Sequence, residues 1–75
     1  MDIALPSYLV VIEPAADGSY SAYVPDLPGC VACGETPEEV ERLIQEGVAL
    51  HVASLRRHGE AVPPPTSRAA RVRAA

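Results

Sequence analysis

The sequence is poor in the features that usually stabilise or anchor a very small fold. Its 75 residues include two cysteines, too few for a disulfide network. No apolar run approaches the roughly 20 residues of a membrane span, and residues 1–7 lack the basic and long apolar regions of a signal peptide. We therefore expect a cytoplasmic protein with reduced thiols and no membrane segment. Because a core this small is only marginally stable, we also expect a homo-oligomer, either a dimer or a tetramer.

Motifs for catalysis and cofactor binding are also missing. The sequence has no phosphate loop, no glycine-rich dinucleotide turn and no Ser/His/Asp or Cys/His arrangement, so we expect no enzymatic activity and no cofactor. Cys30 and Cys33 have C-x-x-C spacing, but on a strand they would face opposite sides. His51 and His58 lie about 10.5 Å apart along one predicted helix and cannot both ligate the same ion. Packing roles for Cys30 and His51, the latter as a hydrogen-bonded core histidine, are therefore favoured over metal binding.

The charge is divided along the chain. Residues 1–60 contain all ten acidic residues and three arginines, a net charge of −7, whereas residues 61–75 contain three arginines and no acid, a net charge of +3. An acidic body attracts basic partners and repels nucleic acid. The same charge also fits an ordinary acidic surface, so composition alone leaves both interpretations open.

Turn signals divide the first half of the chain into three short strands. Residues 8–12, Tyr-Leu-Val-Val-Ile, form an apolar run typical of a strand that is covered on both faces. The Asp17-Gly18 turn joins this run to residues 20–24, whose side chains alternate between two faces, and together they predict an antiparallel hairpin. Two prolines then take residues 25–29 out of the sheet as a rigid loop, and residues 31–33 can return as a third strand.

A helix over residues 37–58 has the clearest local signals. Thr36 is a capping residue, Pro37 suits the first helical position, and Glu39 completes a capping box. Gly59 is the natural residue to follow the helix. The helix face predicted to pack on the sheet consists of Val40, Leu43, Ile44, Gly47, Val48, Leu50, His51 and Leu55.

Apolar character extends beyond that face in the second half of the helix, at Ala49, Val52 and Ala53. This surplus is either a subunit contact or a consequence of the high helix propensity of alanine. After the helix, residues 60–65 can add at most one or two residues to a sheet edge before the prolines stop pairing. Residues 68–75 have no apolar periodicity, so we expect a flexible basic tail there and a single domain over residues 1–67.

One ordered set of residues resembles the HicB-like antitoxin domain. The Pro-Asp-Leu-Pro-Gly-Cys loop followed by Gly-x-Thr-x-Glu-Glu is specific in combination, and the resemblance covers roughly residues 7–67. The matching positions are Tyr8, Asp17-Gly18, Tyr20, Val24 to Cys30, Gly34-Glu35-Thr36, Glu38-Glu39, Gly59-Glu60 and Val62-Pro63.

The resemblance implies a partial RNase-H-like α+β fold with the order β-β-β-α-β: a three-stranded antiparallel sheet, one helix packed on it, and a short additional C-terminal strand. Members of this family commonly self-associate. They neutralise a small basic mRNA-cleaving toxin, of double-stranded-RNA-binding-like fold, by covering its active surface. Many continue into a helix-turn-helix or ribbon-helix-helix segment that binds DNA. This sequence shows no such segment, so we expect a stand-alone member without direct DNA binding.

The combined prediction is a non-catalytic, antitoxin-like binding protein. We expect the partner-binding surface to lie around the proline loop, at Tyr20, Tyr23, Asp26, Pro28 and Gly29. Alternatively, the prolines and the glycine only fix the turn, and Tyr20 packs in the core. A second function that fits the sequence is an orphan oligomeric module that binds a small molecule or a metal instead of a toxin. A residual nuclease would require carboxylates such as Asp17 and Asp26 to converge on one spot.

Overall fold

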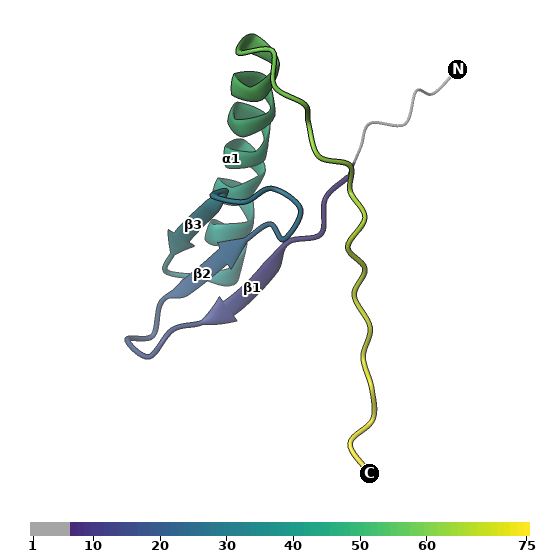
Figure 1. Cartoon of the computed structure of the whole chain (residues 1–75). Helices are drawn as coiled ribbons and strands as arrows, with labels where there is room; N and C mark the ends of the chain where they lie inside the picture. Colours follow the sequence, from purple (N-terminus) through teal and green to yellow (C-terminus); the bar gives the residue numbers. More distant parts are fainter. Residues whose placement is uncertain (1–6) are drawn as a thin grey trace, which may run out of the picture.

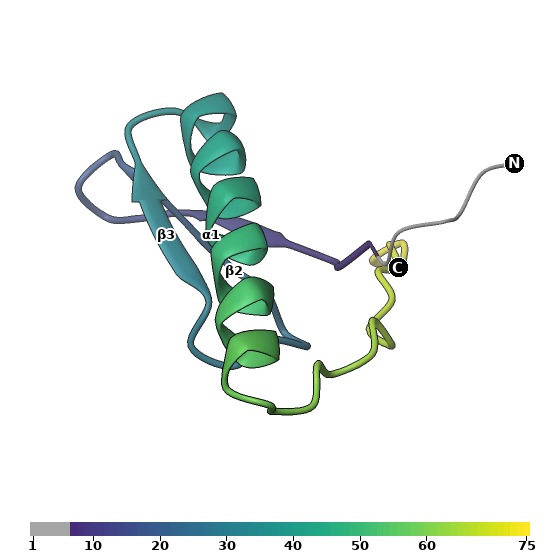
Figure 2. The ribbon, with the colours of Figure 1, turned by 90° about the horizontal axis from the view of Figure 1, so that it is seen from above.

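The computed structural model describes residues 7–75 and contains a three-stranded antiparallel sheet with one helix packed on it (Figure 1). The strands are β1 (Val11–Pro14), β2 (Tyr20–Tyr23) and β3 (Val31–Gly34), in the spatial order β1-β2-β3. The helix, α1 (Pro37–Arg57), follows β3 and lies against a single face of the sheet (Figure 2). The predicted α+β fold is therefore confirmed.

The strand register assigns each side chain to one of two faces. Ala22 of β2 pairs with Ile12 and Ala32, and this row faces α1. The core lies on this inner face and consists of Ala22, Val24, Leu27, Cys30, Val40 and Ile44.

The next row belongs to the opposite face, because neighbouring residues of a strand point to opposite sides. Here Tyr23 pairs with Val11 on one side and with Val31 on the other. Tyr23 is 41% exposed and Val31 is 68% exposed. The prediction that the first strand would be covered on both faces is therefore wrong, since α1 covers only the inner face.

The first strand also begins later than the sequence suggested. It runs over Val11–Pro14 instead of residues 8–12. Pro14 is tolerated at the end of this edge strand. The backbone N–H that proline lacks would point away from β2, where no strand is available to accept it. Tyr8 precedes the strand, and its hydroxyl donates a hydrogen bond of 2.6 Å to the carbonyl of Pro63, 55 residues further along the chain.

The helix begins and ends where its local signals indicate. The Thr36 hydroxyl accepts a hydrogen bond from the Glu39 backbone N–H, and the Glu39 carboxylate accepts one from the Glu35 N–H. At the other end, Gly59 has a φ of 69° and donates to the Arg56 carbonyl, while the Glu60 N–H reaches the Leu55 carbonyl. These two bonds form a Schellman motif, in which glycine is favoured because φ is positive.

The helix is much longer than the sheet beneath it. Its 21 residues span about 31 Å at 1.5 Å per residue, whereas each strand of four residues spans about 13 Å. Val40 and Ile44, in the first half, are fully buried, but His51 is only half-buried and Leu50 is 72% exposed. The prediction that Leu50 packs on the sheet is wrong. Leu55, further along α1, still packs against the core, whereas Leu50 lies about 120° around the helix from the buried Ile44 and so points away from the sheet.

The chain after the helix crosses back toward the start of β1 and then runs away from the body (Figure 1). Within the part of the chain that the structure describes, no strand follows α1. The additional C-terminal strand expected from the family resemblance is not formed, since Pro63, Pro64 and Pro65 lack the N–H donors that pairing requires. Two side-chain contacts hold this segment to the body: the Tyr8 hydroxyl and the carboxylate of Asp26.

Candidate protein-binding surface

The proline loop between β2 and β3 consists of two consecutive β-turns. The Leu27 N–H donates to the Val24 carbonyl at 3.0 Å, and the Cys30 N–H donates to the Leu27 carbonyl at 3.0 Å. Pro25 and Pro28 occupy the second position of these turns, where the fixed φ of proline is favoured. Gly29 follows Pro28 with a φ of 88°, as a type II turn requires. The double turn inserts Leu27 into the core, where it is completely buried.

Asp26 lies between the two prolines and binds the C-terminal segment. Its carboxylate accepts hydrogen bonds from the backbone N–H groups of Thr66 and Ser67, at 3.0 and 2.8 Å. It also accepts bonds from both hydroxyls, at 3.3 Å for Thr66 and 2.8 Å for Ser67. Hydrogen bonds from Ser67, followed by those from Thr66, hold the pKa of Asp26 below its usual value. We call this contact the Asp26 clamp.

The uncovered side of the sheet, which we call the outer face, carries an apolar row at its centre. Val11, Tyr23 and Val31 are direct cross-strand neighbours on this side. The next row outward is Glu13, Ser21 and Cys33. An exposed aromatic residue between two β-branched residues is a surface that gains stability when a partner covers it.

Carboxylates gather at one end of the molecule. The register brings the β1–β2 turn and the β3–α1 connection to the same end of the sheet, because Tyr20 pairs with both Pro14 and Gly34. Asp17 and Glu35 line one shallow hollow there, of about 290 Å³, with Glu38 in the first turn of the helix nearby in sequence. Of the three arginines of α1, Arg56 and Arg57 lie in its last turn, and Arg42 forms an ion pair with Glu46. The surface is therefore acidic at the end where the helix begins.

The structure separates the five residues predicted to form a binding surface. Tyr23 lies on the outer face, and Pro28 and Gly29 are exposed at the tip of the loop. Tyr20 lies on the inner face, partly buried against the core. The carboxylate of Asp26 is occupied by the C-terminal segment.

Sequence reasoning missed two members of the apolar row, Val11 and Val31. Val11 belongs to the run that was interpreted as a strand covered on both faces, and Val31 belongs to the predicted third strand, for which no face was assigned. A usable signal was present, since Val31 and Ala32 must point to opposite sides and only one side of so short a strand can face the helix. The pairing that aligns Val11 and Val31 with Tyr23 depends on register, which single-strand patterns do not reveal.

The residues considered for metal or catalytic chemistry do not converge. Cys30 is buried, and its burial raises the pKa of the thiol, whereas Cys33 is exposed on the outer face. Asp17 precedes β2 and Asp26 follows it, so the two carboxylates lie at opposite ends of that strand. In residues 7–75 no three His, Cys, Asp or Glu side chains are grouped closely enough to hold a metal ion.

No helix of the described chain combines the length and apolar composition needed to cross a membrane. Residues 7–75 thus present an apolar row on the outer face, an exposed loop tip and an acidic end, and no cluster suited to metal chemistry.

The chain is 39% identical over 56 residues to the UPF0150 protein Ta0767 of Thermoplasma acidophilum, covering 75% of this chain and 81% of the relative. It is 39% identical over 57 residues to the UPF0150 protein ssr1765 of Synechocystis, covering 76% and 72%. An uncharacterised 14.9 kDa protein of Haemophilus phage HP1 is 34% identical over 56 residues, covering 75% of this chain and 41% of the phage protein. The HicB-like antitoxins of bacterial toxin-antitoxin systems match residues 8–74, and the chain belongs to this family.

Proposed function

We propose that this protein neutralises a small, basic, mRNA-cleaving toxin by covering the active surface of the toxin with the outer face of its sheet. Family membership supports an antitoxin role in general. The observation that carries the specific proposal is the apolar row of Val11, Tyr23 and Val31 on the outer face, in which Tyr23 and Val31 are exposed and Val11 is half-buried. A protein interface needs such an apolar centre, and aromatic residues often contribute most of its binding energy.

The surroundings of the row suit a basic partner. Glu13 lies one row away on the same face, and the acidic end of the molecule lies beyond it. Carboxylates at the rim of an interface accelerate the approach of a positively charged protein and orient it. The loop that joins β2 to β3 lies on the other side of the row from Glu13. Pro28 and Gly29 are exposed at the tip of this loop and offer a rigid contact. The antitoxin would act by steric cover, without chemistry of its own.

The alternative of a metal-binding module has less support. Cys30 and Cys33 point to opposite sides of the sheet, so they do not chelate one ion. His51 lies on the helix face that contacts the sheet side of the molecule, away from the exposed Cys33. The outer face has the composition of a protein contact and not of a ligand site.

We expect a short basic protein, the toxin, to be encoded beside this chain's gene, and co-expression with it tests the proposal. The wild-type chain should restore growth that the neighbouring protein inhibits, and the two should copurify. Val31→Glu should abolish both effects, because it places a carboxylate in the apolar row, directly beside Tyr23. Val72→Glu is the matched control, since Val72 is 88% exposed in the C-terminal segment and away from the sheet. Failure of the wild-type chain to restore growth, or rescue by Val31→Glu, would reject the proposal.

A further inference from the structure

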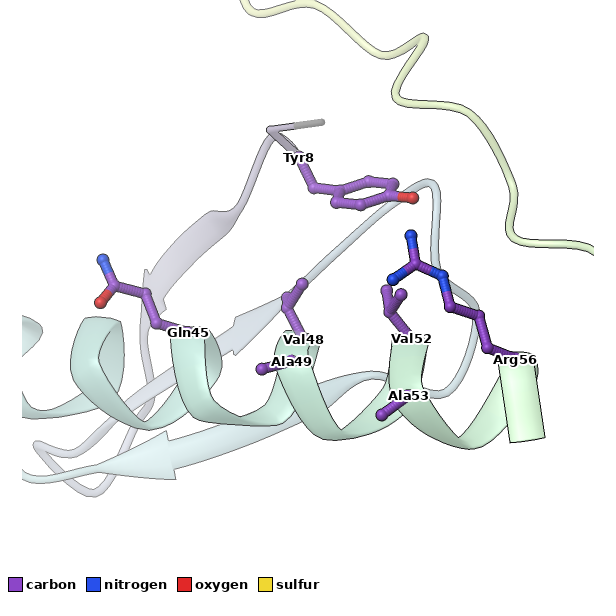
Figure 3. A pocket seen from close by; sticks show the side chains of 7 residues that line it. All are labelled: Tyr8, Gln45, Val48, Ala49, Val52, Ala53 and Arg56. Carbon is purple, nitrogen blue, oxygen red and sulfur yellow. The ribbon is translucent and has the colours of Figure 1, made fainter. Parts of the chain in front are cut away.

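One flank of α1 carries an apolar stripe that the described chain leaves open. Val48 and Val52 point toward the ring of Tyr8 across an open groove of about 370 Å³ (Figure 3). Ala49 and Ala53 line the same groove and are exposed. These helix residues repeat at intervals of three and four, so they lie together on one side of α1. The groove therefore has a continuous apolar wall along the helix.

The groove lies between α1 and the segment that leads into β1. Because α1 packs mainly on β2 and β3, the inner side of the sheet is open beside the start of β1 (Figure 2). Tyr8 forms the wall opposite the helix. Its hydroxyl donates a hydrogen bond of 2.6 Å to the Pro63 carbonyl, which holds the ring in this position. Both walls are thus fixed by contacts within the domain.

The strand register gives the direction in which the chain passes Tyr8. Both β1 and β3 are antiparallel to β2, so β1 and β3 run the same way. The helix α1 follows β3 and returns over the sheet in the opposite direction (Figure 2). Traced backward from β1, the chain therefore passes Tyr8 toward the last turn of α1. A chain that continues in this direction runs along the groove.

We propose that residues 1–6 of this chain, which precede the described residues, dock in the groove in an extended conformation. Their sequence, Met-Asp-Ile-Ala-Leu-Pro, places Ile3 and Leu5 two positions apart. In an extended chain both side chains point to the same side, here into the groove. Pro6 favours an extended conformation at Leu5, the residue before it. This docking goes beyond the proposed toxin binding, because it uses the inner side of the sheet and leaves the outer face free.

The segment is long enough to fill the groove. Leu5 precedes Tyr8 by three residues, so it can lie up to about 10 Å from it. Val52 faces Tyr8, and Arg56, at the end of the groove, lies one turn further, about 6 Å along the helix axis. Leu5 therefore reaches Val52, and Ile3 reaches the last part of the groove.

The covalent link favours residues 1–6 over a separate molecule as the occupant. A segment joined to its site by a short linker has an effective concentration of about millimolar, so a modest apolar contact keeps it docked. The charges also agree, because Asp2 carries the one charged side chain of residues 1–6 and Arg56 is positive at the end of the groove.

Nuclear Overhauser contacts in the full chain test the docking directly. The methyl protons of Leu5 should show contacts with those of Val52, which is 47 positions away in the sequence. Dilution should leave these contacts unchanged, since both groups belong to one chain. The absence of the contacts would overturn the proposal. Contacts that weaken on dilution would also overturn it, because they would assign the groove to another copy of the chain.

A double-mutant cycle measures the same contact. Leu5→Ser should lower Tm by roughly 4 °C or more, because it removes an apolar side chain from the groove. Ala4→Ser is the matched control, on the side of the segment turned away from the helix, and should change Tm little. In a Val52→Ala background, Leu5→Ser should lower Tm clearly less, because its contact is already lost. Equal effects of Leu5→Ser and Ala4→Ser, or an undiminished effect beside Val52→Ala, would overturn the proposal.

Discussion

Single residues of the proline loop each have a distinct structural role. Pro25 and Pro28 fix two turns, Leu27 fills the core, and Asp26 holds the C-terminal segment. The sequence indicated a rigid loop because proline and glycine act locally on the backbone. The role of Asp26 could not be predicted, because its hydrogen-bond donors lie 40 and 41 residues further along the chain.

The clamp predicts a specific effect of Asp26→Asn. The variant should retain its secondary structure but exchange the amide hydrogens of Thr66 and Ser67 faster, as measured by hydrogen exchange. Asp17→Asn is the control, since Asp17 accepts its bonds from Ser19. That change should not affect residues 66–67. Equal exchange at these two amides in wild type and Asp26→Asn would show that the carboxylate does not hold the segment.

The clamp should also depend on pH in a direction set by its hydrogen bonds. The folded pKa of Asp26 is lowered, so the clamp is fully present above the unfolded value, about 3.9 for an aspartate. It is lost as the pH falls through the lower, folded pKa. In the wild type, the amide hydrogens of Thr66 and Ser67 should therefore lose their protection from exchange in acid. In Asp26→Asn, the protection of these two amides should depend little on pH. Protection that persists in acid would contradict this account.

The two cysteines should differ in reactivity. Cys33 is exposed and should react promptly with a thiol reagent, whereas Cys30 is buried with a raised pKa and should react only when the chain unfolds. Counting labelled thiols by mass spectrometry over time, with Cys33→Ser as the control, checks this difference. Two thiols reacting at the same rate would mean that Cys30 is not packed under the helix.

At the scale of elements, the helix was predictable and the limits of the sheet were not. The signals at Thr36, Pro37 and Gly59 act within a few residues, and they placed both ends of α1 correctly to within one residue. The start of β1 was misplaced because Tyr8 turns toward Pro63, a contact that no local pattern encodes. The exposure of Leu50 was missed because the predicted apolar face was too broad: the sheet covers the side of α1 that carries Val40 and Ile44, and Leu50 lies at the edge of that face.

The cap at the start of α1 should be measurable by itself. Thr36→Ala removes the acceptor for the Glu39 N–H and should lower the free energy of unfolding by about 1 kcal/mol. In a domain of this size, that loss corresponds to a fall in Tm of roughly 4–8 °C. Ser54→Ala, at an exposed position within the helix, serves as the control and should change Tm little. An unchanged Tm for Thr36→Ala would show that the cap does not stabilise the fold.

At the scale of the whole molecule, one helix covers a small sheet incompletely, so the outer face stays open, with Tyr23 at its centre. We propose that this face meets a toxin. The family was predictable from the order of its motifs, whereas the exposed row required the strand register.

The central claim is that the outer face covers a toxin, and inhibition of RNA cleavage tests it most directly. The expected toxin, a short basic protein sought beside this chain's gene, would be purified and assayed for mRNA cleavage with increasing amounts of this protein. Wild type and Leu50→Glu should both inhibit cleavage, while Val31→Glu should require at least about tenfold more protein. Inhibition by Val31→Glu equal to that of the wild type would contradict the account.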